Sequence, residues 1–149
     1  MDLKMKEIRR KELSAGIMLL GAYYVLVILC YLLFEMVPIN YRPILINGNL
    51  EASYPSSTTL LVLSVMPTLK YQTDRRIANP VIRKAITVFV IVFAAFMVIG
   101  RLISGVHWVT DIAGSVFLSS GLFMIYRYMA DYFVSKKVTL KTEESDGVQ

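Results

Sequence analysis

The sequence predicts an all-α fold, a polytopic membrane bundle of about four transmembrane helices. Apolar residues make up 56% of the 149 residues, which exceeds the share in ordinary soluble domains, and the mean hydropathy is +0.56. Several apolar runs reach or approach the roughly 20 residues that a helix needs to cross a bilayer. Because no repeat or linker divides the chain, we expect one membrane domain over residues 1–149 with a helical core at 15–134.

Four apolar runs define the predicted spans. They cover residues 15–36, 57–69, 85–103 and 107–134. The first run is too long for a cleaved signal peptide and has no small-residue cleavage site after it. The second is marginal in length, and we expect Pro67 to kink or end it near the cytoplasmic side.

The connections between these spans carry turn-forming residues. Three prolines and an Asn-Gly-Asn stretch at 47–49 predict turns in the first connection, residues 37–56. The second connection is predicted at 70–84, with a turn at Asn79-Pro80. Gly105 marks a short third connection before the last span.

The positive charges indicate how the chain crosses the membrane. The net charge is +5, and basic residues cluster before the first span, at 70–84 and after the fourth span. Since cytoplasmic loops are rich in Lys and Arg, we place both termini in the cytoplasm, with a lead-in at 1–14 and a polar tail at 135–149. Topology explains the clusters, so we expect no nucleic-acid partner. Cys30 has no partner within one chain for a disulfide or a cysteine metal site.

This topology brings polar residues from three separate stretches of the sequence to the extracytoplasmic face. They are Arg42, Ser56, Ser57, Arg101, His107 and Asp111. Charged side chains beside the hydrocarbon region are costly and usually mark function. The convergence of several such residues on one face is the main evidence for a site.

These residue types suit the handling of phosphate. His107 and Asp111 would share a helix face if the fourth helix starts at His107. The carboxylate would then accept one imidazole proton and leave the other nitrogen free to attack. Arginine forms paired hydrogen bonds to phosphate oxygens, and a helix that starts at the two serines would present N–H groups to an anion.

Each residue also has a structural explanation, and both explanations stay open. His107, next to Trp108, would belong to an interfacial aromatic belt, and Asp111 would cap the fourth helix. The serines would be ordinary N-caps, and the arginines would extend to lipid phosphates. Each explanation suffices for one residue, but the gathering of all of them on one face favours the phosphate site.

The motif at residues 100–111, GRLISGVHWVTD, resembles the type-2 phosphatidic acid phosphatase superfamily of lipid phosphate phosphatases. That family carries Lys-x6-Arg-Pro, then Pro-Ser-Gly-His or Pro-Ser-Ser-His, then Ser-Arg-x5-His-x3-Asp. Arg101, His107 and Asp111 stand in register with the third motif, and Gly100 replaces its serine. The context is similar to bacterial members, and the resemblance covers residues 15–134.

The resemblance implies a mechanism and a substrate class. His107 would attack phosphorus and form a phosphohistidine, and Asp111 would orient the ring. The phosphoryl oxygens would be bound by Arg42, Arg101, Ser56 and Ser57. The family needs no metal or other cofactor, and it acts on lipid phosphates and isoprenoid diphosphates among the membrane lipids.

Three departures from the family pattern bear on activity. Thr58 replaces the histidine of the second motif, and Glu35 replaces the lysine of the first. The family histidine protonates the leaving group, and losing a general acid typically costs about 10²–10⁴ in rate. Four spans match only the core of the six-helix family fold. A homo-oligomer, or a partner that supplies the missing helices, therefore stays open.

Two functions follow from these residues. The first is a multi-pass cell-membrane phosphatase that hydrolyses a lipid phosphate or isoprenoid diphosphate at the extracytoplasmic face. The alternative is a catalytically impaired relative that binds lipid phosphates or has a structural role. Because a diphosphate releases a better leaving group than a lipid alkoxide, it would tolerate Thr58 better. Whether the chain is a phosphoric monoester or diphosphate hydrolase stays open at this point.

Overall fold

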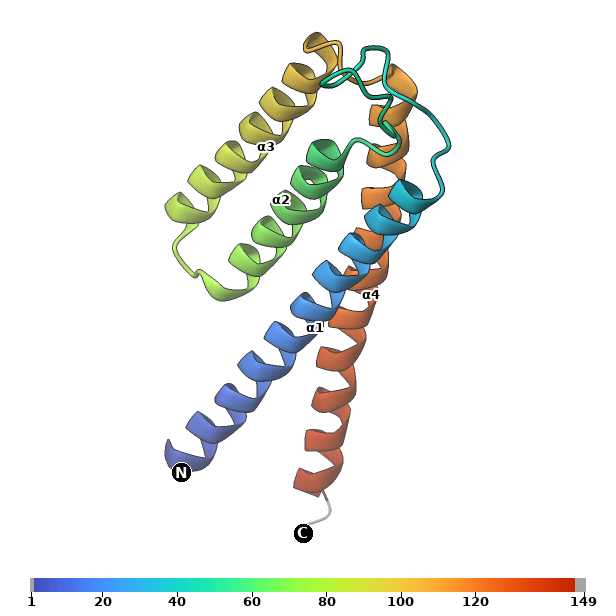
Figure 1. Ribbon diagram of the computed structural model, residues 1–149. Helices are drawn as coiled ribbons and strands as arrows, with labels where there is room; N and C mark the ends of the chain where they lie inside the picture. Colours follow the sequence, from blue (N-terminus) through green and yellow to red (C-terminus); the bar gives the residue numbers. More distant parts are fainter. Residues whose placement is uncertain (1, 147–149) are drawn as a thin grey trace. The chain divides into compact units, whose positions relative to one another are not determined.

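The computed structural model is all-helical and describes residues 2–146, with side chains described for residues 15–133 (Figure 1). The helices are α1 (Asp2–Met36), α2 (Ser57–Arg76), α3 (Pro80–Ile103) and α4 (Val109–Asp146). The described residues form isolated β-bridges in the first connection but no strand. The predicted all-α class is confirmed.

Three of the helices contain segments long and apolar enough to cross a membrane. They are Ala15–Met36, Pro80–Ile103 and Val109–Phe133. The α2 helix is less apolar than these segments, because its buried residues other than Leu60 are Thr59, Ser64, Thr68 and Thr73. Hydroxyl groups lower its hydropathy, although they can bond inside the protein, as Thr68 Oγ1 does to the Val65 carbonyl at 2.8 Å. A crossing by α2 stays a prediction.

The α2 helix is longer than the sequence indicated. It continues through Pro67 as far as Arg76. Of the two expected effects of Pro67, an end of the helix is therefore wrong, and a kink stays a prediction. Proline has no N–H, and it removes one hydrogen bond from the helix without preventing the following turns from forming. The connection to α3 is therefore residues 77–79, much shorter than the predicted 70–84.

The Asn79-Pro80 pair begins α3. The Asn79 side chain accepts hydrogen bonds from the backbone N–H groups of Val81 and Ile82, at 2.9 and 3.4 Å. Pro80 takes the first helical position, where its missing N–H has no partner to lose. This tight cap lets α3 run antiparallel to α2 and pack against it (Figure 1).

The chain divides into two compact units. One unit is Val25–Phe123, which contains α2, α3 and every site residue predicted above. The other joins the residues up to Tyr24 with those from Met124 onward. In that second unit the buried rings of Tyr23 and Tyr126 contact each other, with centroids 4.9 Å apart. All predicted site residues therefore lie within one unit.

The first connection, residues 37–56, is an ordered hairpin-like loop. Its two limbs meet at an antiparallel bridge between Tyr41 and Ala52. At its tip Asn47 and Gly48 have φ angles of 50° and 81°, the left-handed conformations that an Asn-Gly turn adopts. The predicted turn is confirmed, and the bridged limbs bring residues on both sides of it together.

The α4 helix begins at Val109, two residues later than predicted. His107 therefore precedes the helix and does not share a helical face with Asp111. The helix continues to Asp146, so the predicted polar tail extends α4 as far as the described residues go.

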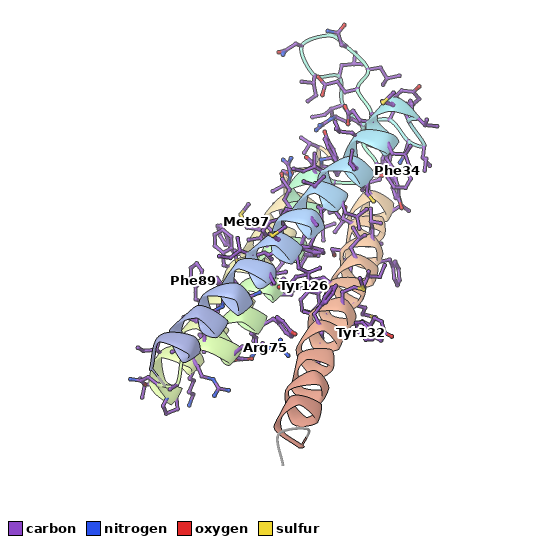
Figure 2. All side chains as sticks on the ribbon, turned by 90° about the horizontal axis from the view of Figure 1, so that it is seen from below. Phe34, Arg75, Phe89, Met97, Tyr126 and Tyr132 are labelled. Carbon is purple, nitrogen blue, oxygen red and sulfur yellow. The ribbon has the colours of Figure 1, made fainter. Side chains whose placement is uncertain are left out.

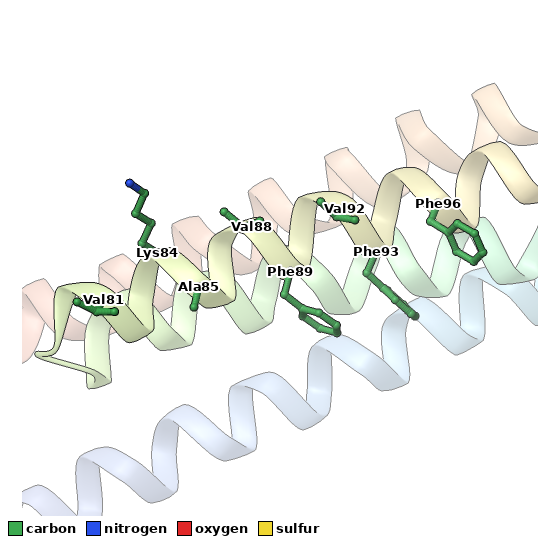
Figure 3. Close-up of a pocket in the computed structure, with 8 residues that line it drawn as sticks. All are labelled: Val81, Lys84, Ala85, Val88, Phe89, Val92, Phe93 and Phe96. Atoms are coloured by element: carbon green, nitrogen blue, oxygen red, sulfur yellow. The ribbon is translucent and has the colours of Figure 1, made fainter.

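The outer face of α3 is apolar. Phe89 projects from it and is 54% exposed (Figure 2). Side chains from Val81 to Phe96 form an open apolar groove of about 780 Å³, with Lys84 as its one charged side chain (Figure 3). The groove contains none of the predicted site residues. A membrane-spanning helix with such a face fits lipid acyl chains.

Candidate functional site

The site lies where the first connection meets the N-terminal end of α4. The loop limbs are held by hydrogen bonds from Arg42 N to Glu51 O at 3.1 Å and from Ser53 N to Asn40 O at 2.9 Å. Trp108 Nε1 donates to the Tyr41 carbonyl at 2.8 Å. These bonds fix the loop against the residues that lead into α4.

His107 is buried, with 6% of its surface exposed. Its Nδ1 lies 2.9 Å from the carbonyl oxygen of Ser53. A carbonyl only accepts hydrogen bonds, so Nδ1 carries the proton and Nε2 has a free lone pair. Nε2 is buried and has no hydrogen-bond partner in the protein. A nitrogen in this state is available for nucleophilic attack.

Asp111 is fully buried and uses both carboxylate oxygens. Oδ2 accepts the backbone N–H of Trp108 at 2.9 Å, and Oδ1 accepts the amide of Asn40 at 3.1 Å. His107 Nδ1 lies 3.6 Å from Oδ2, a distance of charge interaction and not of hydrogen bonding. Asp111 thus caps α4 and also lies beside the imidazole, which combines the two explanations that the sequence left open.

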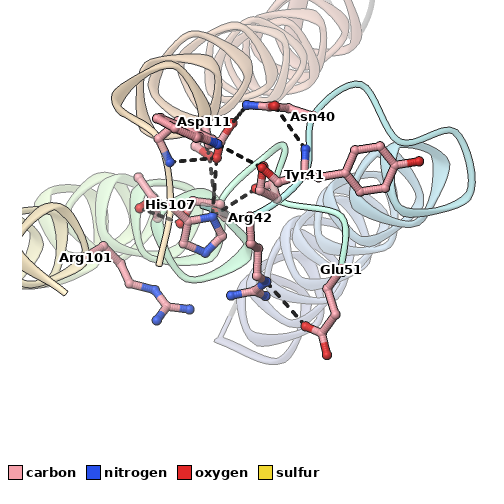
Figure 4. Close-up of polar contacts among 12 residues, drawn as sticks. Asn40, Tyr41, Arg42, Glu51, Arg101, His107 and Asp111 are labelled. Carbon is pink, nitrogen blue, oxygen red and sulfur yellow. Dashed lines mark hydrogen bonds and ion pairs between the residues drawn. The ribbon is translucent and has the colours of Figure 1, made fainter. Parts of the chain in front are cut away.

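Two arginines flank His107 in Figure 4, one from the loop and one from the last turn of α3. The Nε atoms of Arg42 and Arg101 are buried without a hydrogen-bond partner. Arg42 Nε lies 3.3 Å from Glu51 Oε2, close enough for charge attraction but poorly directed for a hydrogen bond. The two guanidinium groups disfavour a positive charge on the imidazole, whereas the Asp111 carboxylate favours it.

This setting keeps His107 neutral. Burial lowers the pKa of His107 below its ordinary value, and the charges of Arg42 and Arg101 lower that pKa further. The bond to Ser53 and the charge of Asp111 act in the opposite direction but do not outweigh them. An unprotonated, basic nitrogen beside two guanidinium groups suits attack on a phosphorus centre whose oxygens the arginines hold.

The start of α2 is tied to the same place. Ser56 is the N-cap residue and is fully buried, but its side chain accepts from Thr59 Oγ1 at 3.1 Å and makes no cap bond. Its backbone N–H donates to the Asp111 carbonyl at 3.4 Å. Ser115 Oγ donates to both the Ser56 and the Asp111 carbonyls, at 3.1 and 2.9 Å. Ser56 therefore joins α2 to α4.

Ser57 and Thr58 form the first turn of α2 and are half-buried. The first N–H groups of a helix have no partner within it, so this turn offers anion-binding donors. Glu35 is exposed in the last turn of α1, where its carboxylate accepts a hydrogen bond from the Tyr31 hydroxyl, which is also within the electrostatic influence of Arg42.

Sequence reasoning missed two contributors. The Ser53 carbonyl is a main-chain group, and no residue type signals it. Asn40 carries a side-chain amide that sequence position alone could have flagged, since it stands two residues before Arg42. Within residues 15–133, no group of three or more His, Cys, Asp and Glu side chains is placed to hold a metal ion.

Comparison with known proteins places the chain in a family. Curated proteins and solved structures yield no match. The PAP2 superfamily profile matches residues 13–135, which is most of the chain and contains every residue of the site. Together with the membrane-crossing helices and the Arg101–His107–Asp111 register, this match shows that the protein is a membrane protein that belongs to the PAP2 superfamily.

Proposed function

We propose that this protein hydrolyses a lipid phosphate or isoprenoid diphosphate through a phosphohistidine at His107. The observation that carries the proposal is the state of the ring. Nδ1 is fixed on the Ser53 carbonyl, and the buried Nε2 has no partner and lies between two arginines. A purely structural histidine would normally have both ring nitrogens satisfied when buried.

The first chemical step is attack by Nε2 on phosphorus. The Nε2–P bond forms, and the P–O bond to the leaving group breaks with its electron pair on that oxygen. The ring becomes positively charged, and the nearby Asp111 carboxylate stabilises that charge at 3.6 Å. Arg42 and Arg101 bind the non-bridging oxygens, assisted by the N-terminal turn of α2.

The second step returns the enzyme to its starting state. Water attacks phosphorus, the Nε2–P bond breaks with its electron pair on nitrogen, and inorganic phosphate leaves with both protons of the water as dihydrogen phosphate. The proton of Nδ1 stays hydrogen-bonded to the Ser53 carbonyl throughout, so the ring needs no tautomer change between turnovers. Splitting one displacement into two is the usual benefit of covalent catalysis.

Thr58 favours a substrate with a good leaving group. Thr58 stands where the family has a histidine acid, and a threonine hydroxyl is too weak an acid to replace it. A lipid alkoxide needs protonation as it leaves, whereas a phosphate leaving from a diphosphate needs it much less. We therefore expect an isoprenoid diphosphate to react faster than phosphatidic acid.

The face of the membrane follows from charge. The basic residues around 70–84 and at both ends of the chain favour cytoplasmic placement. The loop at 37–56 and the start of α4 then belong to the extracytoplasmic side. The site would act on lipids whose phosphate headgroups reach that leaflet.

A second function has one observation in its favour. Without the acid at Thr58, a cradle of two arginines and a helix start can bind a lipid phosphate without cleaving it. The protein would then be a lipid-phosphate-binding or structural membrane protein. Hydrolysis releases phosphate and forms a phosphohistidine at His107, whereas binding alone does neither.

The deciding experiment measures phosphate release by the full chain purified in detergent. The substrates are phosphatidic acid, phosphatidylglycerol phosphate and an isoprenoid diphosphate, and the variants are His107→Ala and Thr58→His. We expect release from the diphosphate that is abolished in His107→Ala. We expect Thr58→His to speed phosphatidic acid hydrolysis by about 10²–10⁴, the usual contribution of a general acid.

The other outcomes separate the two functions. Release that persists in His107→Ala contradicts the phosphohistidine. No release from the native chain, with release gained in Thr58→His, assigns the native chain to binding. No release from either protein contradicts the enzymatic proposal for this chain.

A further inference from the structure

Asn40 makes a contact that links the first connection to α4. Its Nδ2 donates to Asp111 Oδ1 at 3.1 Å, although the two residues are far apart in sequence. The amide oxygen fixes the orientation of this side chain, because Oδ1 accepts a hydrogen bond from the N–H of Tyr41 at 3.0 Å. The donor side of Asn40 must therefore face the carboxylate.

This contact completes the restraint on Asp111. Oδ1 is held by Asn40, and Oδ2 is held by the Trp108 N–H at 2.9 Å. With both oxygens occupied, the carboxylate stays 3.6 Å from His107 Nδ1. The imidazole proton is left to the Ser53 carbonyl at 2.9 Å.

The main chain of Asn40 also holds Ser53, whose carbonyl accepts the proton on His107 Nδ1. The Asn40 carbonyl accepts the N–H of Ser53 at 2.9 Å, and the carbonyl of Ser53 orients His107. One residue thus positions both groups that lie next to Nδ1. Without the Asn40 amide, only the Trp108 N–H restrains the Asp111 carboxylate. The carboxylate then competes with the Ser53 carbonyl for the proton on Nδ1.

We propose that Asn40 is a positioning residue for His107, acting through Asp111. It holds the carboxylate at charge-interaction distance, so that Nδ1 bonds to Ser53 and Nε2 stays unprotonated and available. This inference rests on the proposed function for its catalytic meaning. Its structural part concerns only the hydrogen bonding and the pKa of the His107 ring, which can be measured without a substrate.

The charges that face His107 come from three elements. Arg42 lies on the loop, Arg101 on α3 and Asp111 on α4. A neutral substitution at Asn40 leaves all three charges in the protein. A change in the ring then reports the geometry and hydrogen bonding of Asp111, because no formal charge has been removed.

The test uses Asn40→Leu, which keeps the branching and the number of side-chain heavy atoms and removes both polar groups of the amide, the donor to Asp111 and the acceptor for the Tyr41 N–H. The matched control is Asn49→Leu, an exposed asparagine of the same loop. His107 is the only histidine, so the ¹⁵N resonances of labelled imidazole in the full chain report its tautomer and pKa directly. We expect the pKa of His107 to rise in Asn40→Leu, because a carboxylate that approaches the ring stabilises its positive charge more strongly.

Kinetics supply a second readout. The arginines that bind phosphate are unchanged, so we expect KM to stay near the native value. We expect kcat to fall about tenfold to a hundredfold, a usual cost of small misplacement in an active site. Asn40→Ser, which is smaller and cannot clash, serves as the second variant if Asn40→Leu does not fold.

The outcomes are distinguishable from those of the proposed function. An unchanged pKa of His107 in Asn40→Leu or Asn40→Ser, as in Asn49→Leu, overturns the role of Asn40. If the native chain releases no phosphate but the pKa of His107 rises in the Asn40 variant, the positioning role holds and the enzymatic function fails. An equal change in Asn49→Leu assigns the effect to the loop and overturns the assignment to Asn40.

Discussion

At the scale of single residues, the two nitrogens of His107 have opposite surroundings. Nδ1 is bonded to the Ser53 carbonyl, whereas Nε2 is buried without a partner. The sequence placed an acid four positions after this histidine, and we expected that acid to receive the ring proton. The acceptor is a main-chain carbonyl instead, because the bonds from Trp108 and Asn40 hold the Asp111 carboxylate 3.6 Å from Nδ1, too far for a hydrogen bond.

Removing one arginine should change the titration of this ring. Arg42 and Arg101 both lower the pKa of His107, so Arg101→Gln should raise it. The neutral ring is the nucleophile, and its low pKa keeps it neutral to a lower pH than an ordinary histidine. With a raised pKa, the ring becomes protonated and stops being a nucleophile at a higher pH.

Imidazole ¹⁵N resonances followed against pH measure this change in the absence of substrate. Arg83→Gln is the control, because Arg83 pairs with Asp74 at 3.5 Å, at the far end of α3 from Arg101. An unchanged or lowered pKa in Arg101→Gln contradicts the electrostatic account of the site.

At the scale of elements, the loop before α2 is packed against α4 through an aromatic ring. The ring of Tyr54 lies against Gly114 and meets Phe34 edge-on at 5.3 Å between centroids. A Cβ on Gly114 would lie 2.1 Å from the Tyr54 ring. Glycine at this position lets the loop approach α4 closely enough for Ser53 to reach His107.

We expect Gly114→Ala to displace Tyr54 and weaken the site. Overpacking of this kind usually costs about 1–3 kcal/mol of stability, and the Ser53–His107 bond should be disturbed with it. Gly121→Ala on the same helix has open space around its Cβ, and alanine there favours the helix. Thermal unfolding in detergent and the His107 ¹⁵N spectrum measure both effects. Equal behaviour of the two variants contradicts the close-approach argument.

At the scale of the whole molecule, the positive charges and the helix order predict which side each loop occupies. Three segments are apolar enough to cross a membrane, whereas α2 carries buried hydroxyl groups and falls short. If α2 crosses as well, the loop at 37–56 and the 77–79 connection lie on opposite sides. The position of the phosphate site depends on that crossing.

Cysteine labelling tests the crossing of α2. Cys30 is the only native cysteine, so Cys30→Ser provides a background for Asn49→Cys and Ala78→Cys, both exposed positions. In intact cells, a membrane-impermeant maleimide should label Asn49→Cys and should reach Ala78→Cys only after lysis. Labelling of both variants in intact cells would show that α2 does not separate the two loops.

The helical class, the turn at Asn47-Gly48 and the charged residues that gather at the candidate site were all predictable from the sequence. Apolar run length, turn chemistry and charge are local properties, so they can be read along the chain. Helix ends were less well predicted, as α2 runs past Pro67 and α4 starts after His107.

The contacts among the residues of the candidate site could be seen only in the folded protein. The Ser53 carbonyl and the Asn40 amide reach the site because the bridged loop folds against α4. A backbone carbonyl is present at every residue, so no sequence pattern distinguishes the one that orients His107. The same contacts decided that Asp111 both caps its helix and lies beside the ring, because each carboxylate oxygen accepts a different donor.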